Sequence, residues 1–191
     1  MEQVYDQTFE KGDLKEKQLK KGEYDNCTFK QCDLSDTNFS EMIFVDCTFI
    51  GCNLSMVMLG KTTFRDVVFK ECKMLGLRFD HCSEFGLSFS FEKCVLNHSS
   101  FFKTKIKKTP FKDSQLQGVD FTECDLASCV FDNCDLSDAT FERTVLEKAD
   151  LRRSYNYSID PENNKLKKAK FSLSAVAGLL TKYGIEIDPK N

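Results

Sequence analysis

The sequence predicts a solenoid, because large apolar residues recur at every fifth position along most of its 191 residues. A period of five fits neither an amphipathic helix, which repeats at about 3.6 residues, nor a strand, which repeats at about 2. The chain must therefore turn through a fixed angle every five residues, and each short unit buries its apolar face by stacking on its neighbours. Two series of apolar positions carry the pattern: Phe9, Leu14, Leu19, Tyr24, Phe29, Leu34, Phe39, Phe44, Phe49, Leu54, Leu59, Phe64, Phe69, Met74 and Phe79, and then Phe91, Leu96, Phe101, Ile106, Phe111, Leu116, Phe121, Leu126, Phe131, Leu136, Phe141, Leu146 and Leu151.

A second position of the repeat, two residues before each large apolar residue, carries small side chains. Cysteine is frequent at this position, and its small, commonly buried thiol suits a narrow interior. The cysteines could instead form a disulfide framework or a metal site. Stacked inward side chains, however, run parallel rather than toward each other, and a spacing of five matches no zinc pattern. We therefore expect structural packing and no metal or other cofactor. All ten cysteines occupy the small position: Cys27, Cys32, Cys47, Cys52, Cys72, Cys82, Cys94, Cys124, Cys129 and Cys134.

Segments such as Cys124-Asp-Leu-Ala-Ser and Ala149-Asp-Leu-Arg-Arg follow the pattern A(D/N)LXX. With 28 positions in register over roughly residues 5–155, the chain resembles the pentapeptide repeat proteins. The resemblance implies an all-β fold, a right-handed quadrilateral β-helix in which four repeats form one square coil and residues 20 apart stack. Twenty-eight repeats then predict about seven coils.

The register slips by two residues between Phe79 and Phe91, where Glu84 falls at a position that should be apolar. We expect a bulge or short loop at residues 84–90, between an N-terminal module of residues 1–83 and a second module of residues 91–155. A tolerated insertion explains the slip. In Qnr-type members of the family, however, loops that project from the coils help to engage the target, so both interpretations stay open.

The repeat is expected to stop after Leu151, because Asn156 takes the next central position. Residues 156–191 form a C-terminal cap, which an open solenoid needs to cover its exposed backbone edge.

Within this cap, residues 175–183 predict a short amphipathic helix, with Ser174 as its N-cap and Gly184 just beyond its end. Residues 185–187 read as a brief strand.

The cap segment DPENNKLKKAKFS and the helix after it are similar to the C-terminus of Qnr-type quinolone-resistance proteins and of related immunity proteins. This resemblance implies a two-fold homodimer formed through the segment, with Val176, Leu179, Leu180 and Tyr183 at the interface. The alternative is that the helix only folds back on its own last coil.

The sequence contains no recognisable catalytic motif, neither a glycine-rich phosphate loop nor GxSxG or HExxH. Its two histidines, His81 and His98, are expected at the surface. A rod with a filled interior also lacks the concave pocket that an enzyme generally needs, so we expect no enzyme.

Ten unpaired thiols fit a reducing cytoplasm, the first residues do not resemble a signal sequence, and no apolar run approaches the roughly 18 residues of a membrane span. A cytoplasmic protein without membrane contact is expected.

Residues 120–150 carry nine carboxylates against Arg143 and Lys148. The resemblance to Qnr-type proteins implies that the acidic rod imitates duplex DNA, binds DNA gyrase and also topoisomerase IV, and protects the enzyme from quinolones or gyrase-poisoning toxins. A sequence pI near 5.5 argues against direct binding of nucleic acid. Five lysines within residues 103–112 reverse the sign locally, which leaves a generic protein-interaction scaffold as the alternative. The expected contributors to an acidic binding surface are Asp120, Asp125, Asp132, Asp135, Asp138 and Glu142.

Overall fold

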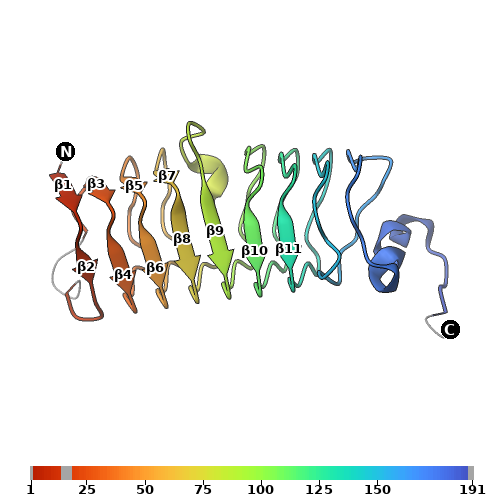
Figure 1. The fold of residues 1–191 in the computed structure, drawn as a ribbon, viewed down its shortest axis with the longest axis horizontal. Helices are drawn as coiled ribbons and strands as arrows, with labels where there is room; N and C mark the ends of the chain where they lie inside the picture. The colour runs from red at the N-terminus through yellow and green to blue at the C-terminus, as the bar shows by residue number, and fades with distance from the viewer. Residues whose placement is uncertain (1, 14–18, 189–191) are drawn as a thin grey trace.

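The structure is a computed structural model that describes residues 2–13 and 19–188, and the chain forms a parallel β-solenoid (Figure 1). One sheet has seven strands in the order β11-β10-β9-β8-β6-β4-β2, and a second has four in the order β1-β3-β5-β7. The all-β solenoid expected from the sequence is thus confirmed. The strands are β1 (Glu2–Tyr5), β2 (Thr8–Phe9), β3 (Gly22–Asp25), β4 (Thr28–Lys30), β5 (Ile43–Val45), β6 (Thr48–Ile50), β7 (Thr63–Arg65), β8 (Val67–Lys70), β9 (Phe89–Glu92), β10 (Pro110–Lys112) and β11 (Val130–Asp132).

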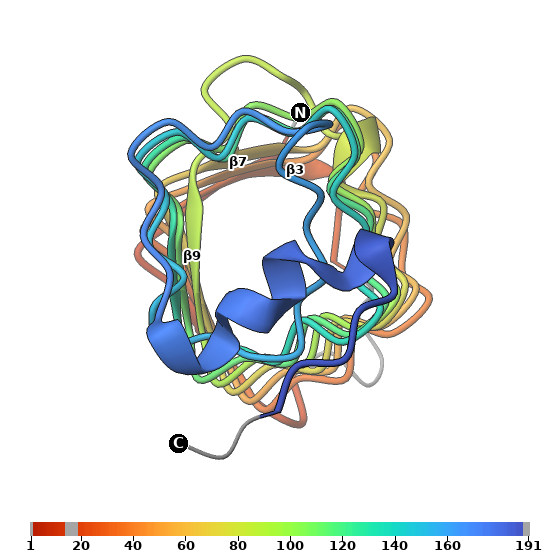
Figure 2. The same ribbon diagram turned by 90° about the vertical axis from the view of Figure 1, so that its right-hand side faces the viewer.

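Each coil has four sides, which are visible end-on in Figure 2. We call the side formed by the seven-stranded sheet face A, and the chain then passes over faces B, C and D before it returns to face A. Face D begins as the four-stranded sheet. Isolated bridges hold the other sides, for example Asn53 with Lys73 on face B and Ser100 with Asp120 on face C. Partners lie one coil apart in the sequence, as in the pairing of Phe29 with Phe49.

Stacked aromatic rings fill the interior of the rod. Phe29 lies on Phe49 with ring centroids 4.5 Å apart, and Phe111 lies on Phe131 at 4.9 Å. Rings of adjacent sides meet edge to face, so every coil is tied to its neighbours by dispersion and aromatic contacts. Leu14, one of the expected central residues, lies outside the described residues.

The small inward position supplies hydrogen-bond donors as well as space. The Cys47 thiol donates to the Tyr24 carbonyl at 3.3 Å, and the Thr144 hydroxyl donates to the Phe121 carbonyl at 2.8 Å. Each accepting carbonyl belongs to a central residue of the preceding coil, so this position favours Cys, Ser and Thr for a reason beyond size. All ten cysteines are buried free thiols.

The coil that crosses the register slip is longer than the others, since Phe69 pairs with Phe91, whereas an unbroken repeat would pair it with Phe89. The 3-10 helix η1 (Phe79–His81) is followed by a loop that projects from the top of the rod in Figure 1. Phe85 in this loop is 83% exposed, whereas Phe89 is buried again at the start of β9. The extra residues therefore leave the rod without interrupting the stacked core.

The stacking continues beyond Leu151, contrary to the expected end of the repeat. Bridges join Val145 to Lys165 and Asp150 to Lys170. Tyr157 and Ile159 are buried where Asn156 was expected to break the pattern. Phe171 also packs on the core, one full coil after Leu151, so the sequence carried a signal for this partial coil that the five-residue count missed.

The end of the rod is covered by two 3-10 helices, η2 (Leu173–Leu179) and η3 (Thr181–Tyr183), rather than by one amphipathic helix. The N-cap is Ser172 instead of Ser174. The Gly178 carbonyl accepts a hydrogen bond from the Ile159 N–H, which ties the helix backbone to the last coil.

A Cβ at Gly178 would lie 2.2 Å from the Tyr157 carbonyl oxygen, so this close approach requires glycine. Gly184 follows η3 with φ of 59°, as expected for a residue beyond a helix end. Residues 185–187 form no strand, and both isoleucines there are exposed.

Candidate interaction surface

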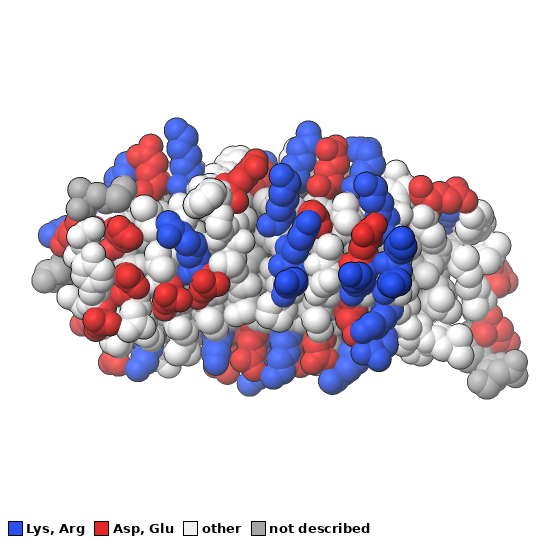
Figure 3. Space-filling model, turned by 45° about the horizontal axis from the view of Figure 1, so that its top comes forward, with Lys and Arg blue, Asp and Glu red and all other residues white. Residues whose placement is uncertain are grey.

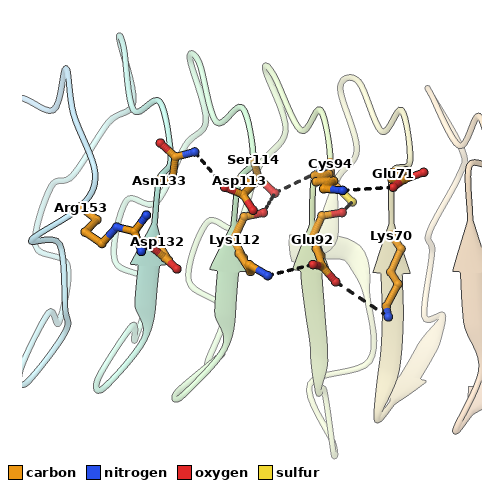
Figure 4. A network of polar contacts seen from close by, with 11 residues as sticks. Lys70, Glu71, Glu92, Cys94, Lys112, Asp113, Ser114, Asp132, Asn133 and Arg153 are labelled. Carbon is orange, nitrogen blue, oxygen red and sulfur yellow. Dashed lines mark hydrogen bonds and ion pairs between the residues drawn. The ribbon is translucent and has the colours of Figure 1, made fainter.

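Ion pairs neutralise most charges on face A. The Glu92 carboxylate lies between Lys112 at 3.0 Å and Lys70 at 3.8 Å, and Arg153 lies 3.1 Å from Asp132 (Figure 4). Each pair joins successive coils, because the stacking of one coil on the next places opposite charges one above the other. Face A is therefore a ladder of compensated charges.

The six acidic residues expected to form one binding surface lie on four sides of the rod. Asp132 is on face A, Asp135 is on face B, and Asp125 is on face D. Asp120 is on face C, and by the five-residue repeat Glu142 follows on the same face and Asp138 occupies the corner between faces B and C. The structure thus distributes these carboxylates around the rod instead of gathering them.

Three of the six are also ion-paired. Asp125 lies 3.1 Å from Lys107, Asp132 pairs with Arg153, and Glu142 lies 3.8 Å from Arg143.

Asp135 accepts hydrogen bonds from Ser137, Gln117 and Asn156. Partial burial raises the pKa of Asp135, but these hydrogen bonds outweigh burial and leave the pKa below its ordinary value. Asp120 and Asp138 have no ion pair among the described residues.

The first half of face D carries a different set of carboxylates, which the sequence analysis missed. This half consists of β1, β3, β5, β7 and the corners that follow them. Glu2 in β1 is paired with Lys20 at 3.5 Å. The other carboxylates there have no ion pair within the described residues, and Arg65 is the one Lys or Arg in the sequence of these strands and corners. A signal existed in the sequence, since positions 6, 26, 46 and 66, spaced by one coil, hold Asp, Asn, Asp and Asp. The unpaired set is Asp6, Glu23, Asp25, Asp46 and Asp66.

The expected dimer residues divide into two pairs. Val176 is 37% exposed and Tyr183 is 55% exposed. Leu179 packs on the core instead, and Leu180 lines a groove between the last coil and the helices. Ile185 and Ile187 line the same groove, so the end of the rod presents an apolar surface to solvent.

Side chains near this surface hold the cap in place. Lys182 lies 2.8 Å from Asp160 and 2.6 Å from Glu162, and Tyr183 donates a hydrogen bond to Glu162. The two carboxylates raise the pKa of the Lys182 ammonium above its ordinary value.

Neither histidine joins a cluster of potential ligands. His81 lies 3.7 Å from Asp80, which is engaged by Arg78, and His98 occupies a corner of the coil with φ of 60°. Within residues 2–13 and 19–188, no group of three or more His, Cys, Asp or Glu side chains is placed to hold a metal ion. No helix in that part of the chain is long and apolar enough to cross a membrane.

Comparison with known proteins agrees with this architecture. Two solved structures of trypsin-treated variants of QnrB1, a plasmid-mediated fluoroquinolone resistance protein, are similar to the chain. One is 15% identical over 97% of this chain and 98% of its own, with a TM-score of 0.62, and the other is 18% identical over 97% of each chain, with a TM-score of 0.56.

No curated protein matches the sequence. A family model described as a pentapeptide repeat region matches residues 22–83 and 77–151. The matched residues make up more than half of the chain, and the protein therefore belongs to the pentapeptide repeat family.

Proposed function

We propose that this protein is a DNA mimic that binds a type II topoisomerase, DNA gyrase and also topoisomerase IV, and protects it from quinolones or gyrase-poisoning toxins. The observation that carries the proposal is the match of the whole rod to QnrB1, over 97% of this chain and 98% of the other. Such a partner would place the protein in the cytoplasm. The protein would perform no chemistry and would act by occupying a DNA-binding surface.

The charge on face D supports mimicry better than the charge in residues 120–150. Neighbouring strands are about 4.8 Å apart, so the five unpaired carboxylates of its first half extend over about 14 Å. That is roughly one charge per 3 Å, close to the spacing of about 3.4 Å per phosphate along one DNA strand. Because these carboxylates are unpaired, a basic protein surface need not displace internal cations to reach them.

We further propose that the protein is a homodimer formed through its C-terminal end. The exposed side chains of Val176, Tyr183, Ile185 and Ile187 support this arrangement, since exposed apolar patches mark interaction sites. In such a dimer the two rods extend in opposite directions from a two-fold axis, a shape suited to a two-fold symmetric enzyme.

Binding to purified gyrase distinguishes the two sets of carboxylates. One variant changes Asp25, Asp46 and Asp66 to Asn, and a matched variant changes Asp125, Asp132 and Asp135 to Asn. We expect the first to lose much more affinity in surface plasmon resonance, and we expect wild-type affinity to fall as salt rises. Equal small losses, with affinity insensitive to salt, would count against charge mimicry.

The alternative is a scaffold that binds another protein. The compensated ion pairs of face A favour it, because they leave little net charge on that side of the rod. Absence of any binding to gyrase or topoisomerase IV would favour the scaffold.

A further inference from the structure

Face D reverses its charge beyond the projecting loop. Four successive coils meet there through the bridges of Lys105 with Asp125, Asp125 with Val145 and Val145 with Lys165. Their outward positions carry seven lysines against two carboxylates, Asp125 and Glu147. Figure 3, which views the rod obliquely over faces D and A, shows Lys and Arg gathered over this region. We call it the lysine half of face D: Lys105, Lys107, Lys108, Lys148, Lys165, Lys167 and Lys168.

Most of these lysines lack the ion-pair partners that most cations have on face A. Lys107 is paired with Asp125 at 3.1 Å, and the other six have no ion pair with any described residue. Backbone stacking brings their columns close together, as in the hydrogen bond from the Lys148 N–H to the Lys167 carbonyl at 3.0 Å. Like charges on adjacent strands repel, so the lysine half lowers its electrostatic energy when an external anion binds.

A hollow of about 370 Å³ lies at the boundary of the lysine half. Lys107, Lys108 and Thr109 form one wall, and Asp66 and Ser88 form part of the other. Asp66 is already engaged by the Ser88 hydroxyl at 3.0 Å. The hollow thus has two lysines on the side of the lysine half and a carboxylate on the opposite side. The carboxylate limits how far an anionic chain can extend toward the N-terminus.

We propose that the lysine half of face D is a docking surface for an acidic segment of a partner protein. The surface is about 14 Å long, three steps of about 4.8 Å, which matches a short run of Asp and Glu residues. Lysine ammonium groups act as mobile point charges that adapt to carboxylates without demanding the planar geometry of arginine. This inference is independent of the proposed binding to a topoisomerase.

The first half of face D argues against nucleic acid as the occupant. Its unpaired carboxylates begin about two coils, roughly 10 Å, from the lysine half, a distance comparable to the Debye length of about 8 Å at physiological salt. A stiff duplex with a persistence length of about 50 nm would extend past the lysine half and, wherever it followed the rod, would meet Asp46 and Asp66. A short acidic segment can end before them.

The test uses the full-length protein and a fluorescent peptide of about six glutamates, which spans roughly 20 Å when extended. We expect saturable binding in fluorescence anisotropy that weakens between about 50 and 200 mM salt. Changing Lys148, Lys167 and Lys168 to Glu should lower affinity at least about tenfold, a loss of roughly 1.4 kcal/mol. The matched control changes Lys30, Lys61 and Lys73 to Glu, which shifts the net charge equally but lies outside the lysine half, and it should retain affinity within about twofold.

A labelled duplex of about 20 base pairs serves as the competing probe. We expect the wild-type protein to bind it at least about tenfold more weakly than the peptide, and we expect the change of Asp25, Asp46 and Asp66 to Asn to strengthen duplex binding. Three results would overturn the proposal: no peptide binding, equal losses in the lysine variant and its control, or duplex binding as tight as peptide binding in the wild-type protein. Circular dichroism checks that each variant is folded.

Discussion

Replacing Phe111 by Ala should destabilise the rod more than almost any other single change. Phe111 is fully buried and stacks between Phe91 at 5.1 Å and Phe131 at 4.9 Å. It also meets Phe101 and Phe121 edge to face. A buried Phe→Ala change costs about 3 to 5 kcal/mol, and aromatic pairs add about 0.5 to 1.5 kcal/mol each beyond burial. We therefore expect a loss near the top of the burial range, about 5 kcal/mol.

Urea denaturation followed by circular dichroism measures this loss, with two companion variants. Phe111→Leu keeps most of the volume, and Leu occupies the central position elsewhere in the rod, so it should lose only about 1 to 2 kcal/mol. Phe85→Ala removes a ring that is 83% exposed and should change stability by less than about 0.5 kcal/mol. If Phe111→Ala and Phe85→Ala cost the same, the stacked aromatic column does not hold the coils together.

Three further predictions concern the thiols, the acid limb of stability and the cap. Burial raises the pKa of Cys47, Cys124 and Cys134 to about 12, so these thiols should resist alkylation until the protein unfolds, and rapid alkylation of the native protein would contradict the burial. The free energy of unfolding should also fall as pH rises from about 9 toward 12, because the unfolded thiols lose their protons in that range and the folded ones keep them. A hydrogen bond and the charge of Arg152 lower the pKa of Asp150 to about 2, so the stabilisation from this pair is complete above the unfolded pKa of 3.8 and disappears as pH falls toward 2. In acid titrations, Asp150→Asn should therefore lose less stability between pH 3.8 and 2 than the wild-type protein. An equal loss in both proteins would be inconsistent with the pairing. Changing both Val176 and Tyr183 to Glu should convert a dimer into a monomer in analytical ultracentrifugation. The same change at Met58 and Phe85, which are exposed apolar residues far from the cap, should leave the dimer intact. A wild-type protein that is monomeric at high concentration would refute the dimer.

The five-residue period was enough to predict the core of the rod, because a single inward position per side has room for a large side chain, which leaves no freedom in where a Phe such as Phe111 can lie. The charges were harder to place. Residues 120–150 are acidic along the chain, but the stacking of successive coils brings Asp125 to Lys107 and Asp132 to Arg153. Charge must be counted along the stack rather than along the sequence, and that count finds both halves of face D.

The cap was predicted less well for a physical reason. The spacing of Val176, Leu179 and Leu180 is that of an amphipathic helix, but Gly178 presses against Tyr157 and its carbonyl bonds to Ile159. These tertiary contacts favour a 3-10 helix over the local preference. Phe171 was overlooked because the repeat resumes after an irregular segment, and a search at the spacing of one full coil would have found it.

The most direct test of the proposed function is a DNA supercoiling assay with purified gyrase and a quinolone, in which this protein is titrated into the inhibited enzyme. The proposal predicts that supercoiling is restored by the wild-type protein and much less by the variant with Asp25, Asp46 and Asp66 changed to Asn. If neither gyrase nor topoisomerase IV is protected at any concentration of the wild-type protein, the DNA-mimic function is contradicted and the protein acts on another partner.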